Sequence, residues 1–103
     1  MLVHVDETLK TLDGQVMRDG DGQGNVIDAT VKLALINALL APVDKESGIE
    51  KVKKYELARK IYRAEKEVEL TVEEVALCKK RVGEVFPTPI VVGQVTEVLE
   101  GKV

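Results

Sequence analysis

The chain has 103 residues, of which 45% are apolar and 32% are charged, and its net charge at pH 7 is −3. This profile is typical of one soluble globular domain and excludes a disordered chain. The acidic balance argues against nucleic-acid binding by the whole surface. A single cysteine, Cys78, excludes an intramolecular disulfide and a multi-cysteine metal site. With no tryptophan and one phenylalanine, the core must be largely aliphatic.

Residues 1–27 are predicted to form a small β-hairpin region. Val3 and Val5 alternate with polar residues, as in a strand with one buried face. Asp13-Gly14 is a turn signal of the type I′ class, and residues 15–17 follow as a short return strand. Because an isolated two-stranded hairpin is marginally stable, we expect it to pack on the helical region, residues 28–101.

The almost continuous apolar run over residues 29–41 predicts a central helix. Its few polar residues do not share one side, and a helix that is apolar nearly all round has to be surrounded by its domain. Asp28 is the expected N-cap, and Pro42 ends the run. At ~20 Å this helix is too short to cross a ~30 Å hydrocarbon core.

A second helix is predicted over residues 49–64, because Ser47 and Glu50 form a capping box before a helical pattern. Its predicted core-facing residues are Val52, Tyr55, Leu57, Ala58, Ile61 and Tyr62. Its predicted solvent-facing residues are Lys53, Glu56, Arg59, Lys60 and Arg63. Residues 65–70 alternate charged and apolar side chains and are expected to form an extended link, with Val68 and Leu70 pointing inward.

Two more helices complete the predicted bundle. Thr71 and Glu74 form a second capping box, opening a helix that ends near Val85. Thr88 and Pro89 begin a last helix that ends near residue 100, although its β-branched residues leave a strand as an alternative. The sequence therefore predicts one mainly helical α+β domain over residues 1–103, with an N-terminal β-hairpin and a compact bundle of about four helices around the central apolar helix.

Catalytic and metal-binding signals are weak. Residues 19–30 align in part with an EF-hand loop, but position 12, where calcium needs a bidentate Glu, is Thr30, and a flexible hairpin loop fits better. His4 is the only histidine, and no nucleophile can be placed beside it. Glu84 lies beside Lys80 and Arg81, which is typical of a solvated mixed-charge surface. We expect no enzymatic activity, cofactor or metal.

Two surfaces are candidates for binding. A basic arc on the second helix is a candidate nucleic-acid interface, made of Lys53, Arg59, Lys60 and Arg63. Acidic residues interrupt this arc, and no exposed aromatic side chain is expected to stack on a base. The last helix is apolar on more than one side, which predicts a protein or self-association interface through Val92, Val95 and Leu99, unless the chain itself buries them.

The order of motifs between Leu12 and Glu100 resembles that of small tailed-bacteriophage and prophage proteins encoded near virion-assembly genes. The motifs are L-D-G-Q-V, A-L-I-N-A-L-L-A-P, K-Y-E-L-A-R-K-I-Y, V-E-L-T-V-E-E and V-V-G-Q-V-T-E-V-L-E. The resemblance implies a genomic context and carries over no functional residue. The leading hypothesis is a non-enzymatic accessory protein of the bacterial cytoplasm, acting through protein contacts in virion assembly. The alternative is a small regulator that binds nucleic acid through the second helix.

Overall fold

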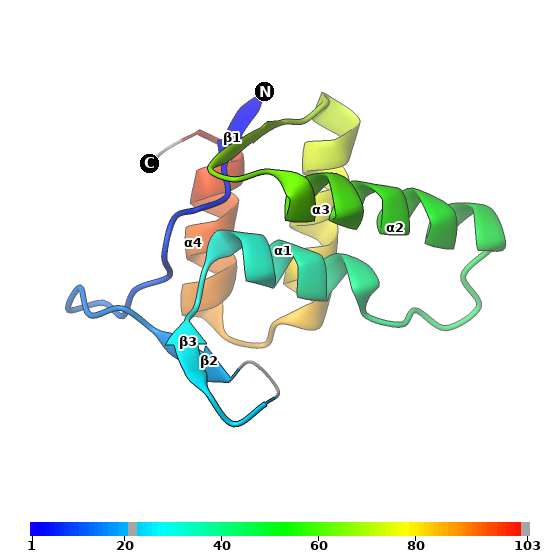
Figure 1. The fold of residues 1–103 in the computed structure, drawn as a ribbon. Coiled ribbons are helices and arrows are strands. Elements are labelled where there is room, and N and C mark those ends of the chain that lie inside the picture. The colour runs from blue at the N-terminus through cyan, green and yellow to red at the C-terminus, as the bar shows by residue number, and fades with distance from the viewer. Residues whose placement is uncertain (21–22, 102–103) are drawn as a thin grey trace.

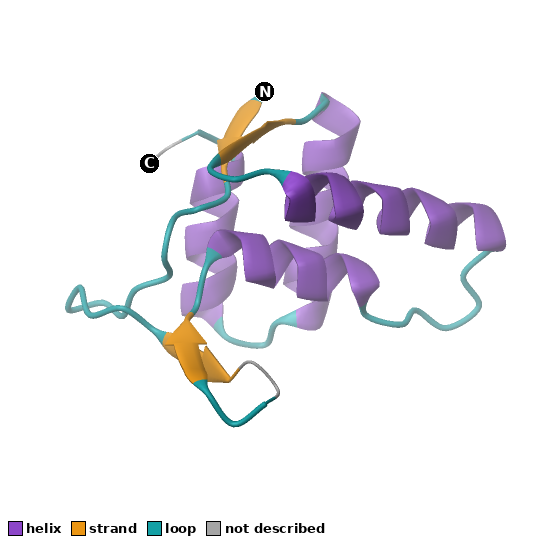
Figure 2. Ribbon diagram, in the orientation of Figure 1, coloured by secondary structure: helices purple, strands orange, loops and turns teal. Residues whose placement is uncertain are grey.

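The computed structural model describes residues 1–20 and 23–101. The described residues form four helices and four short strands, arranged as Figures 1 and 2 show. The helices are α1 (Val31–Leu40), α2 (Gly48–Arg63), α3 (Val72–Val85) and α4 (Pro89–Leu99). The strands are β1 (Leu2–His4), β2 (Arg18–Gly20), β3 (Val26–Asp28) and β4 (Glu67–Glu69). The predicted α+β bundle of four helices is confirmed, and α4 is a helix rather than a strand.

The N-terminal strands pair differently from the predicted hairpin. The turn at Asp13-Gly14 is present, with Gly14 at φ 88°, but Asp13 has no positive φ, so the predicted type I′ geometry was wrong. The segments beside the turn form an isolated bridge between Lys10 and Val16 and a few backbone hydrogen bonds instead of regular strands. The regular hairpin is β2–β3. Strand β1 pairs instead with β4, far away in the sequence, and this antiparallel sheet is the second two-stranded sheet of the described residues.

The link between α2 and α3 follows the sequence prediction. It contains β4, and both Val68 and Leu70 are buried in the core. Val68 lies opposite Val3 of β1 in the register. The charged residues that alternate with them stay exposed, so the period-two pattern of this link did report which side chains point inward.

The N-cap of α1 is Thr30, and the prediction of Asp28 was wrong. The Thr30 hydroxyl accepts a hydrogen bond from the Leu33 backbone N–H at 3.2 Å. Asp28 is the last residue of β3 and pairs with Arg18 at 3.1 Å. Because β2–β3 pairing keeps the chain extended through Asp28, the helix begins later than the local sequence suggested.

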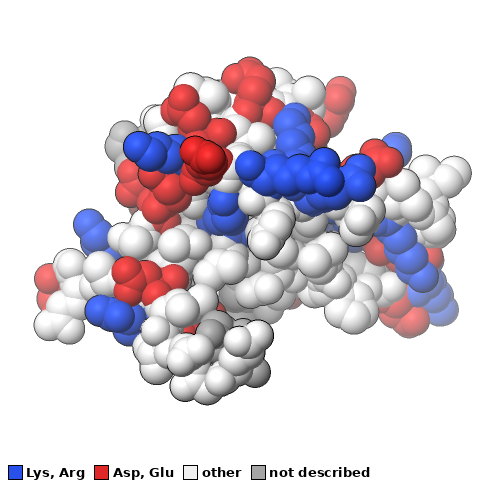
Figure 3. All heavy atoms as spheres, in the orientation of Figure 1, with Lys and Arg blue, Asp and Glu red and all other residues white. Residues whose placement is uncertain are grey.

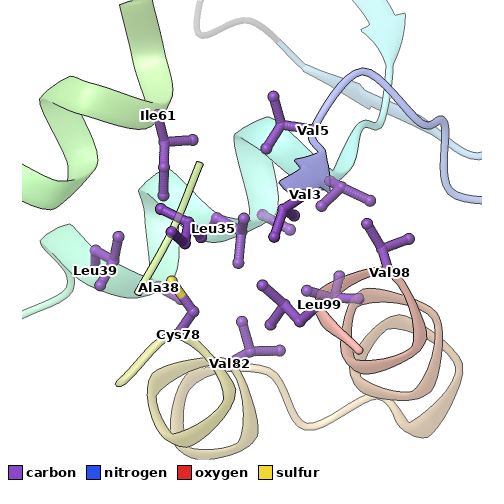
Figure 4. Packing of buried hydrophobic residues seen from close by; sticks show 14 of the residues in the cluster. Val3, Val5, Leu35, Ala38, Leu39, Ile61, Cys78, Val82, Val98 and Leu99 are labelled. Atoms are coloured by element: carbon purple, nitrogen blue, oxygen red, sulfur yellow. The ribbon is translucent and has the colours of Figure 1, made fainter. Parts of the chain in front are cut away.

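The core is aliphatic, as predicted, and α1 contributes to it on several sides. Figure 4 shows Leu35, Ala38 and Leu39 of α1 among side chains from the other helices and from the β1 segment. The surrounding residues labelled there are Val3, Val5, Ile61, Cys78, Val82, Val98 and Leu99. Burial of this surface is the main stabilising contribution to the fold.

Arg81 of α3 is inside the protein, so its prediction as part of a solvated surface was wrong. Its side chain is 5% exposed. The guanidinium donates to the carbonyl oxygens of Ala38 and Ala41, each at 3.2 Å, and pairs with Glu84 at 3.0 Å. The last turn of α1 has no basic residue of its own, so Arg81 satisfies carbonyls that its C-terminus leaves free.

The C-terminus of α2 is capped in a similar way from another helix. The Lys32 ammonium of α1 donates to the carbonyl oxygen of Tyr62 at 3.3 Å and also to that of Ala64. Lys32 is one of the few polar residues of the apolar run, and this contact explains its presence there. Two helix ends are thus fixed by cations from neighbouring helices.

We expect Arg81→Met to lower the free energy of unfolding by about 2 kcal/mol, because buried carbonyls lose charge-assisted hydrogen bonds. Lys80→Met, at an exposed position of the same helix, is the matched control and should change stability by less than about 0.5 kcal/mol. Urea denaturation followed by circular dichroism measures both. Equal stabilities for the two variants would contradict the capping role of Arg81.

Cys78 should be inert to thiol reagents in the folded protein. Burial raises the pKa of the Cys78 thiol from 9.0 to about 12, with a further contribution from the negative charge of Glu74. The reactive species is the thiolate, so labelling by a chromogenic disulfide at pH 8 should proceed only through unfolded molecules. The labelling rate should rise along the urea unfolding curve; fast stoichiometric labelling without urea would contradict this placement.

Candidate binding surface

One flank of α2 carries exposed apolar and aromatic side chains, and it begins at the edge of α1, where Tyr55 lines a cavity with Leu39 and Leu40. Val52, Tyr55 and Tyr62 are 55%, 54% and 70% exposed, although the sequence predicted them to be buried. Ile49, in the first turn, and Leu40, at the end of α1, are exposed as well. We call the side chains of Val52, Tyr55, Arg59, Tyr62 and Arg63 the outer α2 surface.

The prediction failed on the width of the buried stripe. The buried residues of α2 are Lys54, Leu57, Ala58 and Ile61, which form one narrow stripe against the rest of the domain. Helix α2 packs on α1 at the edge of the bundle and has no helix on its other side (Figure 1). The prediction was correct for Leu57, Ala58 and Ile61, at the centre of the predicted core-facing residues. Tyr55 and Tyr62 lie at the side of this group, beyond the part of α2 that α1 covers.

Arg59 and Tyr55 form a direct contact on this surface. The guanidinium carbon of Arg59 lies 5.3 Å from the centre of the Tyr55 ring, which is cation–π geometry. The contact holds an arginine and an aromatic ring together in solvent. Sequence reasoning treated the two as belonging to opposite sides of the helix, although their i, i+4 spacing is the signal that would have joined them.

Helix α2 is strongly basic in an acidic protein. It carries six lysine and arginine residues and two glutamates, a net charge of +4, while the whole chain carries −3. Figure 3 shows basic side chains along α2 and acidic side chains over the neighbouring β1–β4 sheet. Positive charge is therefore concentrated on one exposed element.

The four residues of the predicted nucleic-acid interface do not share one surface. Among the described residues, neither Arg59 nor Arg63 forms an ion pair, and both lie on the outer α2 surface. Lys60 pairs with Glu74 of α3 at 3.2 Å, and Lys53 lines cavities on the α3 side. The predicted set is thus split between the outer surface and the groove between α2 and α3.

The predicted protein interface on α4 lies largely in the core. Val95 and Leu99 are fully buried and Val92 is half-buried. Helix α4 packs on α3, α1 and β1, so the chain itself covers this apolar surface. The excess apolar area expected on α4 is found on α2 instead.

Two cavities lie between α2 and α3, with volumes of about 480 and 310 Å³, and both are lined by Lys53 and Leu77. In the larger one, burial acts to raise the pKa of Glu74. The backbone N–H of Thr71 and the Lys60 ammonium outweigh burial, and the net result is a lowered pKa. In the smaller one, the Lys54 ammonium pairs with Glu46, and both side chains are almost completely buried.

His4 and the EF-hand-like loop are the residues at which the sequence showed weak catalytic and metal-binding signals. His4 faces Glu67 at 3.5 Å in an exposed pair. Of the EF-hand-like positions, Asp21 and Gly22 lie outside the described residues, and Asp28 is paired with Arg18. Within residues 1–20 and 23–101, no group of three His, Cys, Asp or Glu side chains is placed to hold a metal ion. In the same part of the chain, no helix has the length and apolar character needed to span a bilayer.

Comparisons with protein-family models, with characterised proteins and with solved structures found no match to this chain. The resemblance to phage and prophage proteins therefore stays a prediction. Functional inference depends on the surfaces described above.

The Lys54–Glu46 pair should be important for the position of the α1–α2 loop. Lys54→Met removes the partner of an almost completely buried carboxylate, and we expect a loss of about 3 kcal/mol in the free energy of unfolding. Lys54→Met combined with Glu46→Met removes both charges and should recover part of this loss. Urea denaturation of the two single variants and the double variant measures the coupling. Strictly additive effects would contradict a direct interaction.

Proposed function

We propose that this chain is a non-enzymatic binding protein that docks an acidic protein partner on the outer α2 surface. The observation that carries the proposal is the mixture of exposed aromatic rings with arginines that lack an ion-pair partner among the described residues. Tyrosine and arginine dominate the binding energy of protein interfaces. The net charge of +4 on α2 favours a partner of opposite charge.

A protein partner fits the apolar part of the surface better than a nucleic acid does. Val52, one helical turn before Tyr55, and Leu40, which lines a cavity with Tyr55, expose aliphatic side chains that gain free energy when another apolar surface covers them. Phosphate groups offer them no such gain. The resemblance to tailed-phage proteins adds a biological context, in which the partner is a component of virion assembly in the bacterial cytoplasm.

Single-stranded nucleic acid is the second candidate, and one observation favours it. Tyr55 and Tyr62 are exposed beside Arg59 and Arg63, so rings for base stacking and cations for phosphates lie together. This removes the objection that no aromatic side chain is available. The two candidates differ in salt dependence, because neutralising several phosphates makes affinity fall steeply with salt.

The test uses the full chain and the variant Tyr55→Ala/Tyr62→Ala. We expect the double variant to lose at least ~30-fold in affinity for proteins that the wild type retains from a host extract, because each tyrosine is a hot-spot residue. Val72→Ala, at an exposed apolar position outside α2, is the control and should bind normally. Captured proteins are then purified and titrated by calorimetry at low and high salt.

The same proteins are titrated with a single-stranded oligonucleotide, followed by fluorescence anisotropy. Unchanged protein binding by the double variant would overturn the proposal. Salt-sensitive oligonucleotide binding that requires the two tyrosines, with no such protein binding, would replace it with the second candidate. Both tyrosines are exposed, so the variants should keep their stability, which urea denaturation verifies.

A further inference from the structure

The smaller cavity between α2 and α3 shares no lining residue with the outer α2 surface, although Tyr55 and the Lys54–Glu46 pair both line a further cavity beside it. It has a volume of about 310 Å³, within the range of small-ligand pockets. Its walls come from the α1–α2 loop, from α2 and from α3. The lining residues are Val43, Glu46, Glu50, Lys53, Lys54, Leu77, Lys80, Arg81 and Glu84.

The charges around this cavity do not balance. Four cationic and three acidic side chains line it. Two ion pairs account for Lys54 with Glu46 and for Arg81 with Glu84. Lys53 on α2 and Lys80 on α3 form no ion pair with any described residue, and only one carboxylate of the lining, that of Glu50, is similarly left over. An anion that enters the cavity thus meets an excess of positive charge.

Arg81 is a third possible hydrogen-bond donor in the cavity wall, beside Lys53 and Lys80, and its position is fixed. Its guanidinium has five N–H bonds, and its interactions with Ala38, Ala41 and Glu84 account for three of them. Those contacts hold the buried group in one orientation beside the cavity, so binding a ligand costs little side-chain entropy at this position.

We propose that this cavity binds a phosphoryl group, either free phosphate or a small phosphomonoester. A phosphomonoester carries about −1.5 to −2 charges at pH 7, opposite in sign to the net charge of +1 on the lining, and its three acceptor oxygens match the three donor groups of Lys53, Lys80 and Arg81. A carboxylate has only two oxygens for the same three donor groups and matches less well. The apolar Val43 and Leu77 leave room for the carbon part of an ester.

Such a ligand joins α2 to α3. In the described residues these helices are already linked by the Lys60–Glu74 pair near the larger cavity, whereas each packs mainly on α1. A bound phosphoryl group adds a second link at the other end of the groove. Ligand binding therefore stabilises the folded state in proportion to the logarithm of its concentration.

The experiment titrates isotope-labelled full chain with inorganic phosphate, with glycerol 3-phosphate and with acetate, at constant ionic strength, and follows the backbone amide signals. We expect saturable shifts at residues lining the cavity, and tighter binding of the two phosphoryl compounds than of acetate. The tighter of the two phosphoryl compounds identifies free phosphate or an ester as the natural form. Equal binding of acetate, or no saturation by either phosphoryl compound, would overturn the proposal.

Matched variants separate this site from general attraction to positive charge. Lys80→Gln should weaken phosphate binding at least about tenfold, because one charge-assisted interaction is lost. Lys79→Gln removes the same charge from the adjacent residue, whose ammonium pairs with Glu100 outside the cavity, and should leave binding unchanged. Equal losses in both variants would overturn the proposal. Tyr62→Ala changes an exposed residue of the outer α2 surface that lines neither this cavity nor its neighbour, and it should bind phosphate normally. A failure of the phosphate site is therefore distinguishable from a failure of the partner-docking proposal.

Discussion

The buried guanidinium of Arg81 connects the elements on which the fold depends. Helix α1 is apolar nearly all round and has no basic residue to cap its own C-terminus. The Ala38 carbonyl near this end is buried and the Ala41 carbonyl is partly buried, where an unsatisfied acceptor is costly. Arg81 of α3 satisfies the carbonyls of Ala38 and Ala41, so the end of α1 and the face of α3 are held in one relative position. Lys32 places α1 against the end of α2 by the same means.

These contacts explain why α2 has a free surface. Helix α2 is fixed by one stripe of buried residues, by Lys32 at its C-terminus and by the Lys54–Glu46 pair near its start. With these attachments on one side, the opposite side needs no cover for the domain to fold. The tyrosines and arginines there contribute little to the core. They are exposed because α2 lies at the edge of the bundle.

Local patterns in the sequence predicted the local structure well. Capping residues located the starts of α2, α3 and α4, and alternation identified Val68 and Leu70 as inward-facing. Properties that depend on distant segments were missed. The pairing of β1 with β4, the burial of Arg81 and the exposure of Tyr62 each depend on which element lies alongside, and no local pattern reports that. Of the predicted basic arc, Arg59 and Arg63 lie on the outer α2 surface, and the tyrosines beside them were expected in the core.

The distribution of charge gives α2 two distinct surfaces. Cations that point into the domain, such as Arg81 and Lys54, are neutralised by acids or carbonyls, because an unpaired charge there would be expensive. Cations at the edge of the domain need no such partner, because water solvates them. Arg59 therefore belongs to a surface open to large partners, and Lys53 to a groove whose volume admits only small ones. The two surfaces meet near Tyr55, which lines a cavity together with Lys54 and Glu46.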